Sequence, residues 1–209
     1  MFENEGNRLC EKADHDAAYF VERGTEAAKR LLLAAILFPI KEEVVPQKNV
    51  AVSKVKWLVL NHLKWSASDA EAVSHLVVEA AKLLENEDWQ TTLTQLSSDR
   101  VQLGQWIRHC KAAWPSVLAL AVVEKAGEDA TAQSTMDDFC RTVTAAKLEK
   151  AYEWRPLLNG KELIHLGAKP GPSLGELMEE LMALQLAHKD LTKEDATDMM
   201  REKIEQRAF

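Results

Sequence analysis

Ser68-Asp-Ala-Glu-Ala-Val-Ser-His-Leu-Val-Val-Glu-Ala-Ala-Lys-Leu-Leu84 is the stretch that decides the fold. Ser68 with Glu71 three residues later is the pattern of a capping box, so we predict that a helix begins there. The apolar residues that follow recur at helical spacing and mark one face: Val73, Leu76, Val77, Ala80 and Leu84. The polar residues of the opposite face are His75, Glu79 and Lys82. The stretch therefore predicts an amphipathic helix packed on a core.

Helical spacing continues on both sides of this stretch. A long helix is predicted over Asp14 to Leu37, closed by Pro39, and then a loop over Glu42 to Asn49. Val52 to Leu63 is predicted to be helical, although its β-branched residues leave a strand over Val50 to Leu60 as the alternative.

Further helices are predicted downstream. One starts near Ser98, with Leu103, Trp106, Ile107, Cys110 and Trp114 inward and Arg108 and Lys111 outward. Pro115 starts another, which ends at Gly127, and a third covers Met136 to Glu153 with Phe139, Val143 and Ala146 inward. The remaining three are a short helix from the Asn159 and Glu162 capping pair to Gly167, one opened by Gly171 and Pro172, and a last one capped by Thr192 that runs towards Arg207.

Glycine and proline are scarce, which favours an all-α fold. The 209 residues include only 8 Gly and 6 Pro, too few for a turn-rich all-β or a linker-rich chain. A polar stretch from Glu128 to Thr135 separates two helical parts. We therefore predict an all-α, multi-helix body over residues 1–130 and a smaller helical tail subdomain over 136–209.

The number of cysteines and the length of the apolar runs indicate in which cellular compartment the protein occurs. Cys10, Cys110 and Cys140 are widely spaced and odd in number, which is typical of reduced thiols inside a cell. The longest apolar run, Leu31 to Pro39, is too short to cross a bilayer. We expect an intracellular protein without a membrane partner, cytoplasmic or else nuclear or mitochondrial.

Motifs for catalysis are missing from the sequence. It has no Walker A motif, no Gly-x-Ser-x-Gly and no Gly-x-Gly-x-x-Gly. Asp14-His15-Asp16 has the letters of a carboxylate metal pair or of a metal-dependent phosphohydrolase, but the other histidines are scattered singly and no phosphate-gripping loop accompanies it. A charged helix start explains it as well, and we predict no catalytic and no metal-binding residue.

Basic residues gather in two stretches although the net charge is −7. Residues 41–65 hold five lysines against two glutamates, with Trp57, His62 and Trp65 between them, and residues 141–170 hold six cations against three glutamates. Such stretches can hold a phosphate backbone by releasing its counterions. A solvated helix face is the alternative interpretation.

Half of the glycine and proline residues fall between 156 and 175. There a helix stops at Gly167, Lys169 follows in a short loop, and Gly171 and Pro172 open a new helix. This would expose the N–H groups of Ser173, Leu174 and Gly175 at a positive helix end, an arrangement that can bind an anion. An ordinary tight junction between two helices is the alternative.

The same window is similar to a known family. Asn159-Gly-Lys-Glu-Leu-Ile-His-Leu-Gly-Ala-Lys-Pro-Gly-Pro-Ser-Leu-Gly175, which contains LGAKPGPSLG, with Leu177 to Gln185 and Glu194-Asp195-Ala196 after it, resembles the tail region of CCA-adding enzymes, the tRNA nucleotidyltransferases of the bacterial and eukaryotic class. Upstream, Leu33-Ala-Ala-Ile-Leu-Phe-Pro39 and Leu63 to Glu71 resemble eukaryotic, particularly fungal, members.

This resemblance implies a helical neck, body and tail that bind tRNA and position its 3′ end. The family's catalytic head motifs, a Gly-Gly-x-Val-Arg-Asp loop and an Asp-x-Asp metal pair among them, do not occur in the sequence. We therefore expect this chain alone to be inactive, with Mg²⁺, ATP and CTP belonging to a head domain or subunit elsewhere. A fragment, a split subunit and a degenerate descendant all stay open, as does a non-catalytic helical protein-interaction module.

The residues expected to contact tRNA come from the two basic stretches and the junction. They are Lys54, Lys56, Lys64, Arg155, Lys161, Lys169, Gly171, Ser173 and Gly175.

Overall fold

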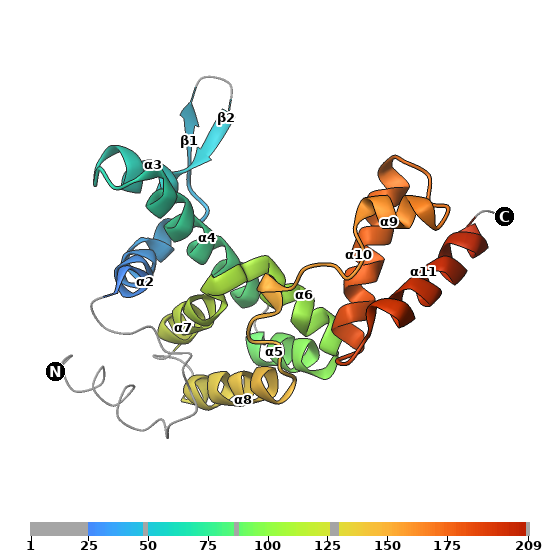
Figure 1. Ribbon diagram of the computed structural model, residues 1–209. Helices are drawn as coiled ribbons and strands as arrows, with labels where there is room; N and C mark the ends of the chain where they lie inside the picture. The colour runs from blue at the N-terminus through green and yellow to red at the C-terminus, as the bar shows by residue number, and fades with distance from the viewer. Residues whose placement is uncertain (1–24, 48–49, 86–87, 126–129, 208–209) are drawn as a thin grey trace. The chain divides into compact units, whose positions relative to one another are not determined.

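The computed structural model describes residues 25–47, 50–85, 88–125 and 130–207. Over these residues the fold is all-α with one small hairpin (Figure 1). The elements are α2 (Glu26–Leu37), η1 (Phe38–Ile40), β1 (Val44–Gln47), β2 (Val50–Ser53), α3 (Lys54–Asn61), α4 (Ala67–Leu84), α5 (Trp89–Ser98), α6 (Arg100–Cys110), η2 (Lys111–Ala113), α7 (Trp114–Lys125), α8 (Ala132–Ala145), η3 (Ala151–Glu153), α9 (Gly160–His165), α10 (Pro172–Ala187) and α11 (Lys193–Arg207).

Helix α4 confirms the predicted amphipathic helix but not its start. Ser66, not Ser68, is the N-cap, and its hydroxyl oxygen accepts a hydrogen bond from the Asp69 N–H at 3.1 Å. The predicted apolar face is buried, with Leu83 rather than Leu84 as its last fully buried leucine. Glu79 was predicted to face solvent and is buried instead, because α4 is covered on more than one side by neighbouring helices.

The core of the first compact unit forms around α4, which packs against α2, α3 and α7. Helix α2 begins after Thr25, whose backbone is extended and whose hydroxyl accepts from the Ala28 N–H at 3.2 Å, so the predicted helix over Asp14 to Leu37 is confirmed for residues 26–37 and is wrong at Thr25. Residues 14–24 lie outside the described residues. Arg30 of α2 donates from Nε to Asp69 Oδ1 of α4 at 2.8 Å. This contact fixes α2 against the first turn of α4.

The loop predicted over Glu42 to Asn49 is wrong in part. Val44 to Gln47 pair with Val50 to Ser53 as an antiparallel hairpin in which Val45 faces Val52. Pro46 is tolerated because a two-stranded hairpin consists of edge strands alone, where a missing N–H costs little. The strand alternative was therefore correct for residues 50–53, and the predicted helix starts at Lys54.

The middle of the chain differs from prediction in its boundaries. Helix α5 was not predicted, and α6 starts at Arg100 with Asp99 as N-cap, the Asp99 carboxylate accepting from the Val101 N–H at 2.8 Å. Pro115 lies in the first turn of α7, as predicted. The predicted end at Gly127 lies outside the described residues.

The helix predicted over Met136 to Glu153 is wrong at both ends, because α8 begins at Ala132, inside the polar stretch Glu128 to Thr135 that was predicted to separate two helical parts. Helix α8 stops at Ala145, and Lys147 follows with a φ of 53°. Phe139 and Val143 are buried as predicted, whereas Ala146 lies beyond the helix.

The described chain divides into two compact units, each drawn from separated stretches. The first combines residues up to Gln95 with Ala112–Thr142, and the second combines Leu96–Lys111 with the residues from Val143 onward. The sequence predicts instead a single boundary between residues 130 and 136. The assignment of residues 1–130 to a body and of residues 136–209 to a tail stays a prediction.

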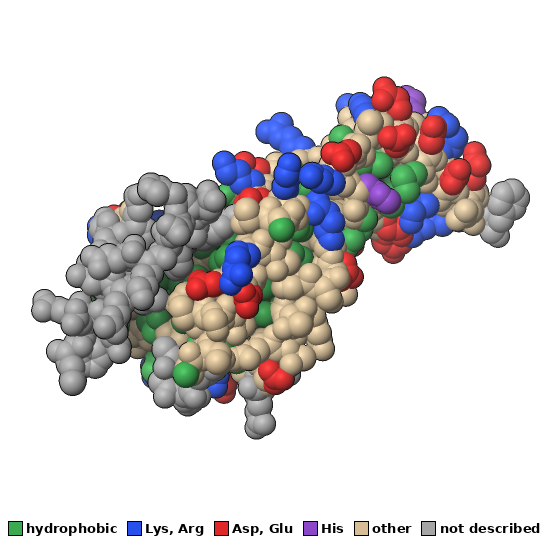
Figure 2. Space-filling model, turned by 90° about the horizontal axis from the view of Figure 1, so that it is seen from below, with side chains coloured by type: hydrophobic (Ala, Val, Ile, Leu, Met, Phe, Trp, Pro, Cys, Tyr) green, Lys and Arg blue, Asp and Glu red, His purple; other side chains and the backbone are tan. Residues whose placement is uncertain are grey.

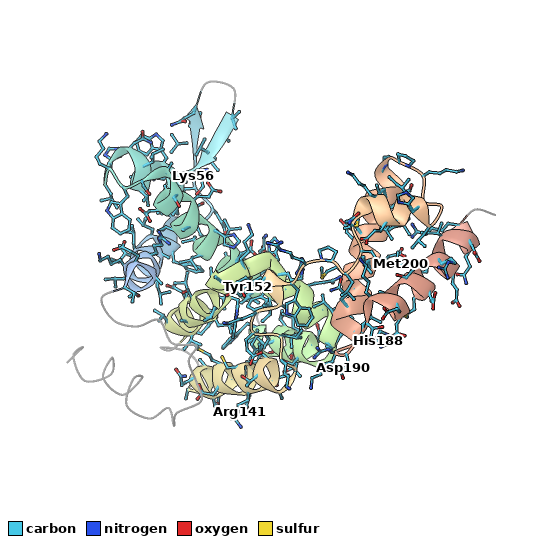
Figure 3. All side chains as sticks on the ribbon, viewed as in Figure 1. Lys56, Arg141, Tyr152, His188, Asp190 and Met200 are labelled. Atoms are coloured by element: carbon cyan, nitrogen blue, oxygen red, sulfur yellow. The ribbon has the colours of Figure 1, made fainter. Side chains whose placement is uncertain are left out.

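In the second unit, α10 packs against α6, α9 and α11. Its core includes Leu163 of α9, Leu181 of α10 and Met200 of α11, which Figure 3 labels. Gly104 of α6 allows the close approach of α10, because a β-carbon there would lie 2.4 Å from Leu186 Cδ2. The helices on either side of the α9–α10 junction are therefore packed into the core of the second unit.

Candidate nucleic-acid interface

The turn that ends α9 follows the predicted glycine rule. The Asn159 side chain accepts from the N–H groups of Lys161 and Glu162, and the Glu162 carboxylate accepts from the Asn159 N–H at 2.7 Å, which is the predicted capping box. At the other end the N–H of Gly167 donates to Ile164 and that of Ala168 to Leu163, both at 3.0 Å. Gly167 has a φ of 109°, which only glycine adopts without strain.

Helix α10 then opens as predicted at Gly171 and Pro172. Gly171 is the N-cap of α10 and has a φ of 135°. As a glycine it has no side chain that could accept a hydrogen bond from the first N–H groups of the helix. Gly171, Ser173 and Gly175 are all exposed, and a β-carbon at either glycine would meet no atom within 4 Å. Packing in the described chain thus does not require glycine at 175, although glycine in a helix costs about 1 kcal/mol relative to alanine.

The predicted set of outward N–H groups needs one correction. The Leu174 N–H donates to the Gly171 carbonyl at 3.1 Å, so it is used inside the first turn of α10. The Leu174 side chain is partly buried against the core of the second unit. Its role is therefore to hold the helix end rather than to face a ligand.

Three cations of the second unit that were predicted to bind RNA are exposed: Arg155, Lys161 and Lys169. Within the described part of the chain, no carboxylate lies at ion-pair distance from any of them. By contrast, Lys193 pairs with Glu162 at 2.5 Å and Lys203 with Glu180 at 3.3 Å. Figure 2 accordingly shows acidic and basic side chains intermixed over the end of the molecule that carries the C-terminus.

Glu162 serves both the cap and this ion pair. Its hydrogen bond from Lys193, together with that from the Asn159 backbone, holds the pKa of the carboxyl below its usual value. The negative charge of Glu162 is thus committed to Lys193 and to the start of α9. Lys161 next to it keeps its own charge unpaired among the described residues.

Sequence reasoning missed the residue that holds Arg155 in place. Gln185 of α10 is 9% exposed, and its Nε2 donates to the Arg155 carbonyl at 3.1 Å. Its Oε1 accepts from the Leu157 N–H at 2.9 Å. A single glutamine on an otherwise apolar helix face, Leu177 to Leu186, was the available indication that a buried polar contact is made there.

Arg108 of α6 holds the residues that precede Arg155 in the same segment. The Arg108 guanidinium donates from one nitrogen to the Ala151 carbonyl at 2.6 Å and to the Trp154 carbonyl at 2.9 Å. Arg108 was predicted to face solvent, and this prediction is wrong because its charge is used to satisfy backbone carbonyls. Burial lowers the pKa of Arg108, consistent with a structural role.

The lysines predicted in the first unit have a different setting. Lys54 pairs with Glu43 at the base of the hairpin, and Lys56, labelled in Figure 3, pairs with Glu71 of α4. Lys64 is exposed and, in the part of the chain that the structure describes, has no carboxylate at ion-pair distance. Trp57 and His62 pack on each other with ring centroids 4.6 Å apart. The positive charge of this stretch is therefore partly neutralised.

No cluster of three or more metal-ligating side chains occurs among the residues that the structure describes. Asp14-His15-Asp16 lies outside them. None of the described helices is long and apolar enough to cross a membrane.

Comparison with known proteins adds one finding. Over 99 residues the sequence is 28% identical to tRNA nucleotidyltransferase cca2 of Schizosaccharomyces pombe. Part of this chain is related to a fungal tRNA nucleotidyltransferase. The match covers 44% of this chain and only 20% of that protein, so the matched residues span about a fifth of the relative's length. No family model matches the sequence, and no solved structure matches it.

Proposed function

We propose that this chain is a tRNA-binding helical part of a CCA-adding tRNA nucleotidyltransferase, which positions the acceptor and T-arm side of tRNA for a catalytic head carried elsewhere. The observation that carries the proposal is the partial match to a protein named as a tRNA nucleotidyltransferase. The all-α fold agrees with it. Cytoplasmic, nuclear and mitochondrial sites of action are all compatible with it.

The junction supports the same proposal physically. The start of α10 presents a positive helix end next to Lys169, with glycine at 171 and 175 leaving room for close approach. Lys161 and Arg155 add cations that carry no ion pair among the described residues. Proteins that recognise structured RNA use shape and phosphate contacts of this kind more than base edges.

A binding experiment tests the proposal. Filter binding at low salt should show tighter binding to tRNA than to an unstructured RNA of equal length, and the affinity should fall steeply with salt. Equal binding of the two RNAs would contradict it. The chain alone should add no nucleotide to tRNA lacking its CCA end when Mg²⁺, ATP and CTP are supplied, and addition by a clean preparation would show that the head is not needed.

Paired variants localise the contact. Lys161→Glu with Lys169→Glu should weaken tRNA binding without lowering the melting temperature, since both side chains are exposed. Lys189→Glu with Arg201→Glu changes the net charge equally on the same unit and serves as the control. Equal losses in the two double variants would indicate a long-range charge effect and leave the junction an ordinary helix turn.

A helical protein-interaction module is the second candidate, and one observation favours it. Leu32 and Ile36 lie one turn apart on α2 and are 66% and 65% exposed, and Val44 and Val50 of the hairpin are 62% and 67% exposed. Leu32 and Ile36 form an exposed apolar stripe on one helix face, and contiguous exposed apolar surface marks sites of contact with other proteins. This candidate predicts a molecular mass that rises with concentration in light scattering and no binding of tRNA.

A further inference from the structure

Three lysines occupy a backbone conformation that side chains avoid. Within the described ranges, the non-glycine residues with positive φ are Lys64 at 57°, Lys111 at 56° and Lys147 at 53°. A β-carbon in this region crowds the backbone, so glycine or asparagine is the usual occupant. Because every described non-glycine residue with positive φ is a lysine, we look for a reason in the lysine side chain.

Lys147 shows the exception most clearly, because the same chain contains the matching glycine case. After α8 the Lys147 N–H donates to Thr144 at 2.9 Å and the Leu148 N–H to Val143 at 3.2 Å. After α9 the same two hydrogen bonds are made by Gly167 and Ala168. This helix-ending motif strongly favours glycine at the position that Lys147 holds.

Lys64 and Lys111 also lie at the C-terminal ends of helices, although their turns differ from that of Lys147. Lys64 follows α3, where the Trp65 N–H closes the turn on the Val59 carbonyl at 3.2 Å. Lys111 is the C-cap of α6 with a ψ of −145°, close to a region that is almost restricted to glycine.

Contacts inside the described protein do not account for the three lysines. All three side chains are exposed, and none has a carboxylate of a described residue at ion-pair distance. The negative end of a helix favours a lysine in its last turn. That gain is available at neighbouring positions with ordinary backbone angles, so it does not explain lysine at positive φ.

Two of the lysines lie at opposite ends of α6 within the second unit. Arg100 in the first turn of α6 donates to the Ala146 carbonyl, and Arg108 in the last turn donates to Ala151 and Trp154. Residues 146–154 therefore run along α6 from its first turn to its last. Lys147 follows the first of these contacts and Lys111 ends the helix, which spans on the order of 15 Å. A nucleic-acid strand places several phosphates along such a length.

We propose that Lys64, Lys111 and Lys147 contact RNA phosphates and occupy glycine-type positions for that reason. This inference rests on the proposed function and adds Lys111 and Lys147 to the predicted contact residues.

Replacement by glycine separates binding from folding. The triple variant Lys64→Gly, Lys111→Gly, Lys147→Gly suits the backbone, so its melting temperature should equal or exceed that of the unchanged protein. Its tRNA affinity should fall, and the slope of log affinity against log salt should become shallower by about 1 for each lysine. One such contact corresponds to about a fourfold change in affinity for a fourfold change in salt.

A matched control removes the same charge from paired lysines. Lys29, Lys82 and Lys203 each form an ion pair, and their triple replacement by glutamine changes the net charge equally. The control should lose clearly less affinity than the glycine variant. Equal losses, or a lowered melting temperature of the glycine variant, would overturn the inference and leave the proposed function standing. Failure of the unchanged protein to bind tRNA would overturn both.

Discussion

Replacing Gln185 by methionine should destabilise the second unit although the side chain keeps its length. The amide bridges two backbone groups of one segment, donating to the Arg155 carbonyl at 3.1 Å and accepting from the Leu157 N–H at 2.9 Å. Gln185 is 9% exposed, so water cannot readily replace either bond. Methionine fills a similar volume, which keeps the cavity contribution small.

The expected loss follows from the two orphaned groups. Leaving one buried backbone donor or acceptor unsatisfied costs about 1–3 kcal/mol. Partial relaxation of residues 155–157 towards solvent places the combined loss near the lower half of the additive range, about 2–4 kcal/mol. A chain of this size should then melt roughly 4–16 °C lower.

Urea denaturation followed by circular dichroism measures the free energy of unfolding, and hydrogen exchange measures protection of the Leu157 amide. Gln102→Met is the control, because Gln102 is exposed on α6 and its replacement should change stability by about 0.5 kcal/mol at most. The reasoning fails if Gln185→Met costs no more than this control, or if the Leu157 amide stays as protected as before.

Four further predictions concern single sites. Asn159→Ala should cost about 1 kcal/mol of unfolding free energy in urea denaturation, because it removes the cap of α9. Gly175→Ala should raise stability by up to about 1 kcal/mol in the same assay, since its β-carbon meets open space, and a loss would show hidden strain. The pKa of Asp69 is lowered by its hydrogen bonds from Ser66 and Arg30, so this carboxylate stabilises the fold above its unfolded pKa and ceases to do so as the pH falls through its folded pKa. Asp69→Asn should therefore lose less melting temperature between pH 5 and pH 3 than the unchanged protein, and equal losses would contradict the assignment. Burial raises the pKa of the Cys140 thiol to about 12, so it should react with a thiol reagent at pH 8 only after unfolding.

Local rules predicted the elements whose ends are set by neighbouring residues. The capping box at Asn159 and the turn at Gly167 depend on side chains and backbone angles within one helical turn, and the structure confirms them. The start of α10 at Gly171 follows from the same kind of rule. These are the parts of the candidate site that could be read from the sequence.

Long-range contacts decided what the sequence could not show. Glu79 is buried because other helices cover α4, and Arg108 is held by carbonyls more than 40 residues away in the chain. The sequence predicts a loop in place of β1 because Pro46 breaks a central strand, whereas it is tolerated in a strand that has a neighbour on one side only.

The same distinction governs the predicted RNA contacts. A count of lysines along the chain treats Lys56 and Lys64 alike, yet Lys56 is paired with Glu71 of another helix whereas Lys64 has no such partner among the described residues. An anion that binds Lys56 must compete with Glu71, so part of its binding energy is already used in the folded protein. Lys64, Lys111 and Lys147 differ from Lys56 in two ways: no described carboxylate pairs with them, and their positive φ costs free energy. Glycine at these positions would stabilise the fold at least as well. We therefore expect the positive-φ lysines, rather than the lysine-rich stretches as a whole, to mark the surface that we propose to bind RNA.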